Sequence, residues 1–169
     1  INALRQLGEL KIARIECGRL LAREPENLQA MRQMAMIAAE QDRSSEAERL
    51  LRRVVELSAE AVEPIKDLAR LCSNQHRYTE AVSGFRRAIE LTPADAGLQL
   101  ELAHAASVIG LMETALEAYS SCYALSPTTR AALLGQGHAL RALGRSDEAR
   151  DIYRQCAQHE ESYADASWS

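Results

Sequence analysis

Aromatic residues are scarce in this sequence, which holds one Phe, one Trp and five Tyr among 169 residues. Val, Ile and Thr are also few, and they never alternate with polar residues for long. Strands favour β-branched and aromatic side chains in such an alternation. An all-β or α/β architecture is therefore disfavoured.

The sequence also lacks long apolar runs and an excess of positive charge. No segment approaches the roughly 18 uncharged apolar residues that a membrane span requires, and the first residues carry no export signal. The formal net charge is −4, so the chain has no overall basic field that would hold a nucleic acid backbone. We expect neither a membrane nor a nucleic acid as a partner.

Closely spaced cysteines are missing as well. The four cysteines, Cys17, Cys72, Cys122 and Cys156, are widely separated. Their spacing contains neither a C-x-x-C metal motif nor the pattern of a disulfide framework. This usage fits a reducing compartment, most simply the cytoplasm.

Alanine, in contrast, is abundant, and small apolar residues at this level favour closely packed helices. Five alanines recur at one constant interval along the whole chain. The residues four and seven positions after each alanine are mostly bulky or sulfur-containing, and this spacing marks one face of a helix. The five alanines are Ala13, Ala47, Ala81, Ala115 and Ala149, followed four positions later by Cys17, Leu51, Phe85, Tyr119 and Tyr153.

A second amphipathic stretch precedes the alanines, and a short polar or Gly-containing turn separates the two stretches of a unit. Pro25, Pro93 and Pro127 occupy one column of the repeat and stop the second helix in three of the five units. The sequence therefore predicts pairs of helices joined by tight turns. The expected helices are 10–23, 28–41, 44–57, 62–75, 78–91, 96–109, 112–125, 130–143 and 146–159.

This pattern resembles the tetratricopeptide repeat over essentially the whole chain, most closely between Leu133 and Cys156. The resemblance implies an all-α fold in which helix-turn-helix repeats stack into a right-handed superhelical solenoid. The implied repeats are a partial one at 1–27, then 28–61, 62–95, 96–129 and 130–163, with 164–169 starting a further repeat or a linker.

The ends of the chain fall inside helices of this register, so we expect a fragment of a larger protein. Ile1, Leu4 and Leu7 would then be uncovered apolar residues of a terminal helix. Self-association through such exposed terminal helices is a further expectation.

A narrower resemblance rests on residues 137–149 followed by 163–169, which include Trp168 and Ser169. These segments look like the junction in bacterial tetratricopeptide-repeat sulfotransferases, where a repeat array precedes the catalytic domain. The resemblance implies a catalytic domain beyond residue 169 that uses a phosphoadenylyl-sulfate donor, with this array presenting the acceptor. No Gly-rich phosphate loop follows a strand here, so no catalytic or donor-binding residue carries over to this chain.

No catalytic set of nucleophile, base and orienting group converges in the sequence. His104 and His138 lie one repeat apart and face the same way, which suggests a metal site. Helices of successive repeats are about 10 Å apart, however, whereas zinc needs each nitrogen at roughly 2.1 Å. We expect no catalytic residue, no metal and no cofactor, and we expect the cysteines to be buried and inert packing residues.

In tetratricopeptide repeats the first helix of each unit lines the concave wall. Basic and imidazole groups outnumber carboxylates on these helices, which predicts a noncatalytic scaffold that binds a peptide, notably an acidic segment, or docks a partner domain. A solvated helix face is the alternative explanation of the same charges. Asp67, Glu101 and Gly135 stand where the carboxylate clamp of chaperone-binding members needs amide or basic groups, which disfavours a chaperone-tail receptor. The candidate residues are Arg32, Lys66, Asp67, Arg70, Asn74, Glu101, His104, His138 and Arg141.

Overall fold

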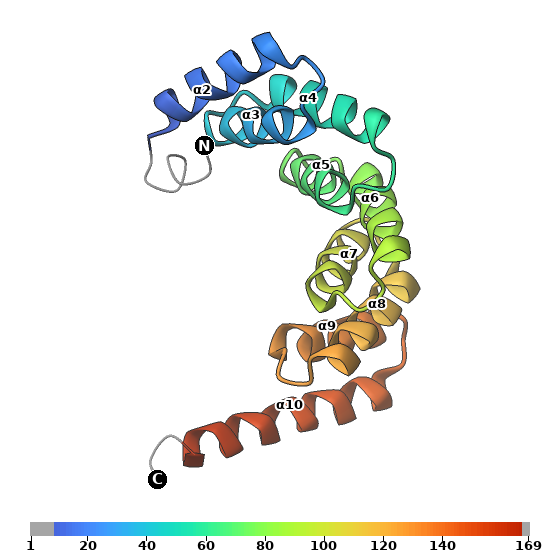
Figure 1. Cartoon of the computed structure of the whole chain (residues 1–169). Helices are drawn as coiled ribbons and strands as arrows, with labels where there is room; N and C mark the ends of the chain where they lie inside the picture. The colour runs from blue at the N-terminus through green and yellow to red at the C-terminus, as the bar shows by residue number, and fades with distance from the viewer. Residues whose placement is uncertain (1–8, 167–169) are drawn as a thin grey trace. The chain divides into compact units, whose positions relative to one another are not determined.

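The computed structural model describes residues 9–166, with side chains for residues 9–158, and this part of the chain consists of helices and turns without strands. The expected all-α fold of helix pairs joined by short turns is confirmed for these residues. Figure 1 shows the helices in chain order. Their bounds are α2 Leu10–Arg23, α3 Leu28–Glu40, α4 Ser44–Leu57, α5 Val62–Asn74, α6 Tyr78–Leu91, α7 Ala96–Val108, α8 Met112–Leu125, α9 Arg130–Ala142 and α10 Ser146–Ala166.

The last helix differs most from its expected bounds. The other helices end within one residue of the expectation, whereas α10 continues from 159 to Ala166. No proline stops α10, because Glu161 stands in the column of Pro25, Pro93 and Pro127. The missing proline is not the whole reason, since Ala59 fills the same place after α4, which still ends at Leu57. The expected repeat boundary after residue 163 thus falls within a helix, and the repeat boundaries as a set stay predictions.

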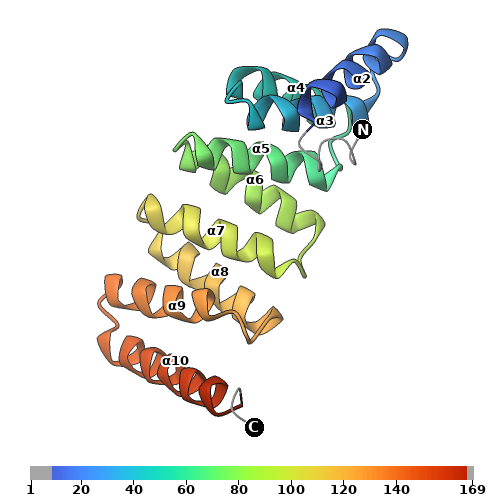
Figure 2. The same ribbon diagram turned by 90° about the vertical axis from the view of Figure 1, so that its left-hand side faces the viewer.

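The chain divides into two compact units between Gln75 and His76. In the first unit, α3 packs against α2 and α4, and α4 packs against α5. In the second unit, each helix from α6 to α10 packs against the next, and α7 also contacts α9. Figures 1 and 2 show that α7 and α9 form one layer of this second unit, with α6 and α8 in the other.

The repeating alanines form the seams where neighbouring helices meet. Ala13, Ala47, Ala81 and Ala115 are fully buried, and Ala149 is 2% exposed. A methyl group at these positions lets two helix backbones approach closely, and a larger side chain would force them apart. The position assigned to the alanine column from the sequence is therefore confirmed.

The turns inside the helix pairs share one backbone feature. Asp42, His76, Gly110 and Gly144, which recur at the same interval as the alanines, all have positive φ, between 57° and 79°. In the first of these turns the Arg43 N–H donates to the Ala38 carbonyl at 2.9 Å, which closes the end of α3. The same bond recurs from Leu111 and from Arg145, so one tight turn type ends these helices.

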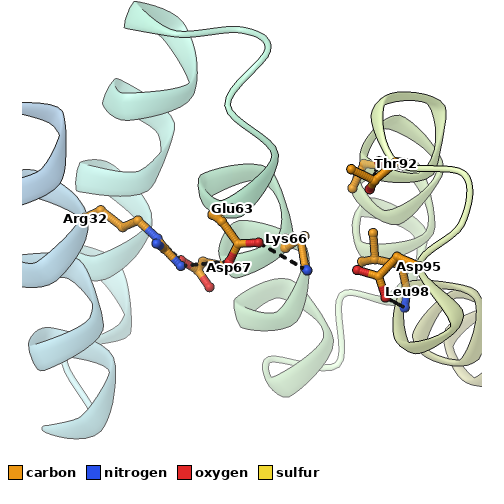
Figure 3. Close-up of polar contacts among 8 residues, drawn as sticks. Arg32, Glu63, Lys66, Asp67, Thr92, Asp95 and Leu98 are labelled. Carbon is orange, nitrogen blue, oxygen red and sulfur yellow. Dashed lines mark hydrogen bonds and ion pairs between the residues drawn. The ribbon is translucent and has the colours of Figure 1, made fainter. Parts of the chain in front are cut away.

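Two first helices carry side-chain caps. The Asn27 Oδ1 atom accepts from the Ala30 N–H at 2.9 Å at the start of α3, and the Asp95 Oδ1 atom accepts from the Leu98 N–H at 3.0 Å at the start of α7 (Figure 3). Each cap satisfies one of the free N–H groups of a first helical turn. These helices are among those that carry the candidate functional residues.

Candidate functional site

The predicted residues are divided between the two units, and each set is described by itself. The α3/α5 face of the first unit is the surface of its first helices that carries Arg32, Glu63, Lys66, Asp67, Arg70 and Asn74. This face contains an ion-pair network (Figure 3). The Arg32 Nε atom lies 2.5 Å from Asp67 Oδ2, and its Nη2 atom lies 3.1 Å from Glu63 Oε2. Lys66 reaches the other oxygen of Glu63 at 3.3 Å. Two of the predicted cations are thus paired with carboxylates of their own chain.

The ion pair between Arg32 and Asp67 is partly buried, which gives it a role in holding the fold together. The Asp67 side chain is 4% exposed and that of Arg32 is 29% exposed. A carboxylate so far removed from water needs a charged or hydrogen-bonding partner, and Arg32 on the neighbouring first helix supplies it. The charges of Arg32 and Asp67 compensate each other. Their ion pair connects α3 to α5.

The remaining predicted residues of the first unit lie further along α5. Arg70 and Asn74 are exposed, and Asn74 is the last residue of the helix. Asp67, Arg70 and Asn74 recur at helical spacing, but Asp67 points into the protein toward Arg32. The excess of basic groups expected here is reduced by the pairing of Arg32 and Lys66.

The α7/α9 face of the second unit is the exposed side of the first helices α7 and α9. It carries Leu100, Glu101, His104, Leu134, His138 and Arg141. His104, His138 and Arg141 are exposed, whereas both leucines and Glu101 are half-buried. The Arg141 guanidinium has no ion-pair or hydrogen-bond partner in the part of the chain that the structure describes. This face thus combines an available cation with two imidazoles and apolar contact.

His104 lies edge-on to a buried tyrosine. Its ring centroid is 5.6 Å from that of Tyr119 on α8, with the two planes at 62°. Tyr119 also lies against Gly135 on α9, where an added Cβ would come within 3.0 Å of the tyrosine ring. Burial raises the pKa of the Tyr119 phenol, and a hydrogen bond with the Ser107 side chain acts in the opposite direction. Tyr119 therefore fills the space between α7 and α9 behind His104.

A second histidine and tyrosine pair follows at the next repeat. The His138 ring lies 5.7 Å from that of Tyr153 on α10, with the planes at 67°. The two pairs differ in one bond, because the Tyr153 hydroxyl lies 3.2 Å from His138 Nδ1. Gly137 leaves the room for this ring, since an added Cβ there would also lie within 3.0 Å of Tyr153.

The described residues contain no group of three or more His, Cys, Asp or Glu side chains that could hold a metal ion. All four cysteines are free and buried, as expected from their packing columns. Burial raises the pKa of the Cys17 and Cys122 thiols. A buried thiol of raised pKa is a poor nucleophile, so these cysteines have the character of packing residues.

Tyr119 and Tyr153 are partners of the candidate histidines that the sequence pattern did not indicate. Tyr119 and Tyr153 were assigned to a packing column, and this column is buried or half-buried as expected. The sequence does contain a sign of these pairs, because the separation from His104 to Tyr119 is the same as that from His138 to Tyr153. Glu63, which pairs with both Arg32 and Lys66, is expected on the same wall of first helices, although it is not one of the candidate residues.

No helix among the described residues is both long enough and apolar enough to cross a membrane. The sequence segment around Trp168, on which the narrower resemblance partly rests, lies outside the described residues, as do Ile1, Leu4 and Leu7. Ile12 and Ile15 on α2 are exposed apolar residues, at 47% and 54%. Self-association through terminal helices stays a prediction.

Comparison with solved structures gives close matches of fold at low sequence identity. A crystal structure of MamA protein has a TM-score of 0.88 and 21% identity, and the match covers 97% of this chain and 90% of that one. MamA from Desulfovibrio magneticus RS-1 has a TM-score of 0.84 and 16% identity, covering 95% and 91%. YrrB, described as a TPR protein with an unusual peptide-binding site, has a TM-score of 0.76 and 18% identity, covering 95% and 88%.

At these identities the structural matches show the fold alone. No curated protein sequence matches the chain. The sequence model of the tetratricopeptide repeat, in contrast, matches residues 66–129 and 111–167, which together make up more than half of the chain. The chain therefore belongs to the tetratricopeptide repeat family.

Proposed function

We propose that this chain is a noncatalytic protein interaction scaffold whose α7/α9 face binds an extended segment of a partner protein. The observation that carries the proposal is Arg141, an exposed cation of α9 without a carboxylate partner among the described residues. Arg32 and Lys66 of the α3/α5 face already have such partners. An acidic segment would supply the missing carboxylate.

Apolar and polar groups alternate on this face in a way that suits an extended peptide. Leu100 and Leu134, one repeat apart and half-buried, offer apolar contact, and the exposed His104 and His138 add hydrogen-bonding groups. Both helices are packed on α8, so the surface is formed before a ligand arrives and binding costs little ordering of the receptor. YrrB, which shares the fold, is described as having a peptide-binding site.

The test is selection from a displayed library of random peptides on the immobilised full chain. We expect selected peptides to carry Asp or Glu next to aliphatic residues and to bind the Arg141→Glu variant at least about ten-fold more weakly. Arg86→Glu is the matched control, because Arg86 is an exposed arginine of α6 in the other layer that contacts Thr114. Equal binding of the selected peptides to wild type and Arg141→Glu would discard this face as the binding site.

The α3/α5 face is a weaker candidate for the same role. Arg70→Glu tests it in the same assay, and we expect a smaller loss than for Arg141→Glu because paired carboxylates already surround the cations of this unit. Helicity should be unchanged in each variant, since Arg70 and Arg141 are both exposed.

The transferase-associated alternative rests on the narrower resemblance of residues 137–149 and 163–169. It predicts that the coding sequence beyond Ser169 continues into a strand and a phosphate-binding loop. Reading that sequence tests it directly. A reducing compartment, most simply the cytoplasm, fits both functions because all four cysteines are free thiols.

A further inference from the structure

The two histidine and tyrosine pairs of the second unit provide an internal comparison. Both pairs place an exposed imidazole against the edge of a tyrosine ring, at 5.6 Å and 5.7 Å between ring centroids. In both, a glycine of α9 leaves room for the tyrosine. They differ in the phenol, which reaches Nδ1 of His138 in one pair but engages the Ser107 side chain in the other.

The proton in the bond between Tyr153 and His138 belongs on the phenol oxygen. A neutral imidazole has one N–H donor and one strongly accepting nitrogen, whereas a phenol is the better donor of the two groups. The Tyr153 hydroxyl has no other hydrogen-bond partner among the described side chains. Donation from Tyr153 to Nδ1 therefore satisfies both groups, and it leaves the imidazole proton on Nε2.

We infer that Tyr153 holds His138 in the Nε2–H form, so that His138 and Arg141 together form a binding site for a side-chain carboxylate of the partner segment. This inference rests on the proposed function and names the chemistry recognised at one end of the α7/α9 face. Tyr153 is a positioning residue here, because it acts through His138.

The positions of the two donors on α9 support a joint site. Residues three apart lie on the same side of a helix, and His138 and Arg141 are both exposed. Since Nδ1 is turned to Tyr153, the opposite ring nitrogen is the one left for a ligand. Two N–H donors, one of them charged, match the two oxygens of a carboxylate better than a single amide oxygen.

The first test reads the tautomer in the full-length, nitrogen-15-labelled chain by long-range proton–nitrogen correlation of the imidazoles. The pH is raised until the imidazole resonances no longer change with pH, so that neutral rings are observed. His138 is assigned by the loss of its signals in His138→Gln. We expect the proton on Nε2, with the Nδ1 resonance upfield of that of His104 because it accepts a hydrogen bond.

Two matched variants separate this bond from ring packing. Tyr153→Phe keeps the ring and removes the donor, so the Nδ1 resonance of His138 should move downfield toward that of His104. Tyr119→Phe removes a hydroxyl that does not reach His104, so the His104 resonances should stay in place. A proton on Nδ1 of His138 in wild type, or an unchanged Nδ1 resonance in Tyr153→Phe, would overturn the positioning role.

The second test measures carboxylate recognition with two blocked pentapeptides, acetyl-Ala-Leu-Glu-Leu-Ala-amide and its counterpart with Gln in place of Glu. Wild type should bind the Glu peptide about ten-fold more tightly, as followed by resonance shifts of α7 and α9. This preference should disappear in Arg141→Gln, fall about three-fold in Tyr153→Phe, and persist in Tyr119→Phe.

The outcomes of the second test distinguish a failure of the carboxylate site from a failure of the proposed peptide-binding function. Equal binding of both peptides to wild type overturns the carboxylate site and leaves the proposed function standing. If neither peptide shifts any resonance of α7 or α9, the carboxylate site and the proposed peptide-binding face are both overturned, whichever tautomer His138 adopts.

Discussion

Gly135 on α9 lies directly against the ring of Tyr119 on α8, where even a methyl group would come within 3.0 Å of the ring. Gly135 is buried, and Tyr119 is 5% exposed, so neither can move aside freely. Glycine in a helix interior costs about 1 kcal/mol relative to alanine, which indicates that this position needs the space. The absence of a side chain at Gly135 thus makes room for the ring of Tyr119.

We expect Gly135→Ala to destabilise the chain by about 1–2 kcal/mol, because overpacking against Tyr119 outweighs the gain in helix propensity. Gly18→Ala in α2 is the control, since its nearest neighbour, the Met34 methyl carbon, is 4.0 Å away from the added Cβ. That variant should gain roughly 0.5–1 kcal/mol. Chemical denaturation of both variants gives the comparison.

A double-mutant cycle checks the cause. Tyr119→Leu shortens the side chain, so Gly135→Ala should no longer destabilise in that background. If Gly135→Ala costs as much beside Leu as beside Tyr119, the contact with the ring is not the reason for the glycine.

The alanine seam gives a second prediction. Ala115 is fully buried on α8, and we expect Ala115→Leu to cost about 1–3 kcal/mol because the helices must separate to hold the larger side chain. Ala124→Leu on the same helix is the control, since Ala124 is exposed and its replacement should change stability by less than about 0.5 kcal/mol. Similar melting temperatures for the two variants would contradict the assignment of the seam.

Much of the fold could be predicted because the repeat supplies the same information five times. The constant interval fixes the helix pairs, and the recurring alanine marks the buried face of each second helix, so errors at one unit are corrected by the others. The repeat does not fix the end of α10, because Glu161 replaces the proline of the column, whereas α4 ends at Leu57 with Ala59 in that place. A proline in this column is therefore sufficient to stop a helix but is not necessary for it to end.

The candidate site was predicted less well, because it depends on which side chains meet between helices. Arg32 and Asp67 are 35 residues apart, and the repeat register places both on a first helix without pairing them. Arg32 and Asp67 come together because α3 packs on one side of α4 and α5 packs on the other side of α4. The same holds for Tyr153 and His138, whose hydrogen bond requires the ring angle and the space left by Gly137.

The Arg32 and Asp67 pair gives a third prediction. Arg32→Met leaves the Asp67 carboxylate, whose side chain is 4% exposed, without its charged partner, so we expect a loss of about 2 kcal/mol. Arg53→Met is the control, because Arg53 is paired at 3.3 Å with Glu26 and with Glu56 on the exposed surface. Its loss should stay below about 0.5 kcal/mol.

Removing the carboxylate as well separates charge from packing. Asp67→Leu in the Arg32→Met background eliminates the buried charge, so stability should return to near the wild-type value. A double variant that is less stable than Arg32→Met alone would show that the carboxylate has a stabilising partner other than Arg32.

The buried thiols give the last prediction. Burial raises the pKa of Cys17 and Cys122, so both thiols stay protonated in the folded chain at a pH where a free cysteine begins to ionise. Since the thiolate is the reactive form, we expect both residues to react with iodoacetamide far more slowly in the folded chain than in urea. Peptide mapping by mass spectrometry after timed quenching measures each residue separately.

The same shift sets the direction of a pH effect on stability. The unfolded chain releases the thiol protons near the ordinary cysteine pKa of about 8.5, whereas the folded chain holds them to higher pH. The stability contribution is therefore constant below about pH 8 and declines as the pH rises through 8.5 toward the folded pKa. Cys17→Ala with Cys122→Ala should have a flatter alkaline profile of unfolding free energy than wild type. Matching alkaline slopes, or alkylation of folded Cys17 and Cys122 at the rate found in urea, would show that these thiols are accessible to solvent.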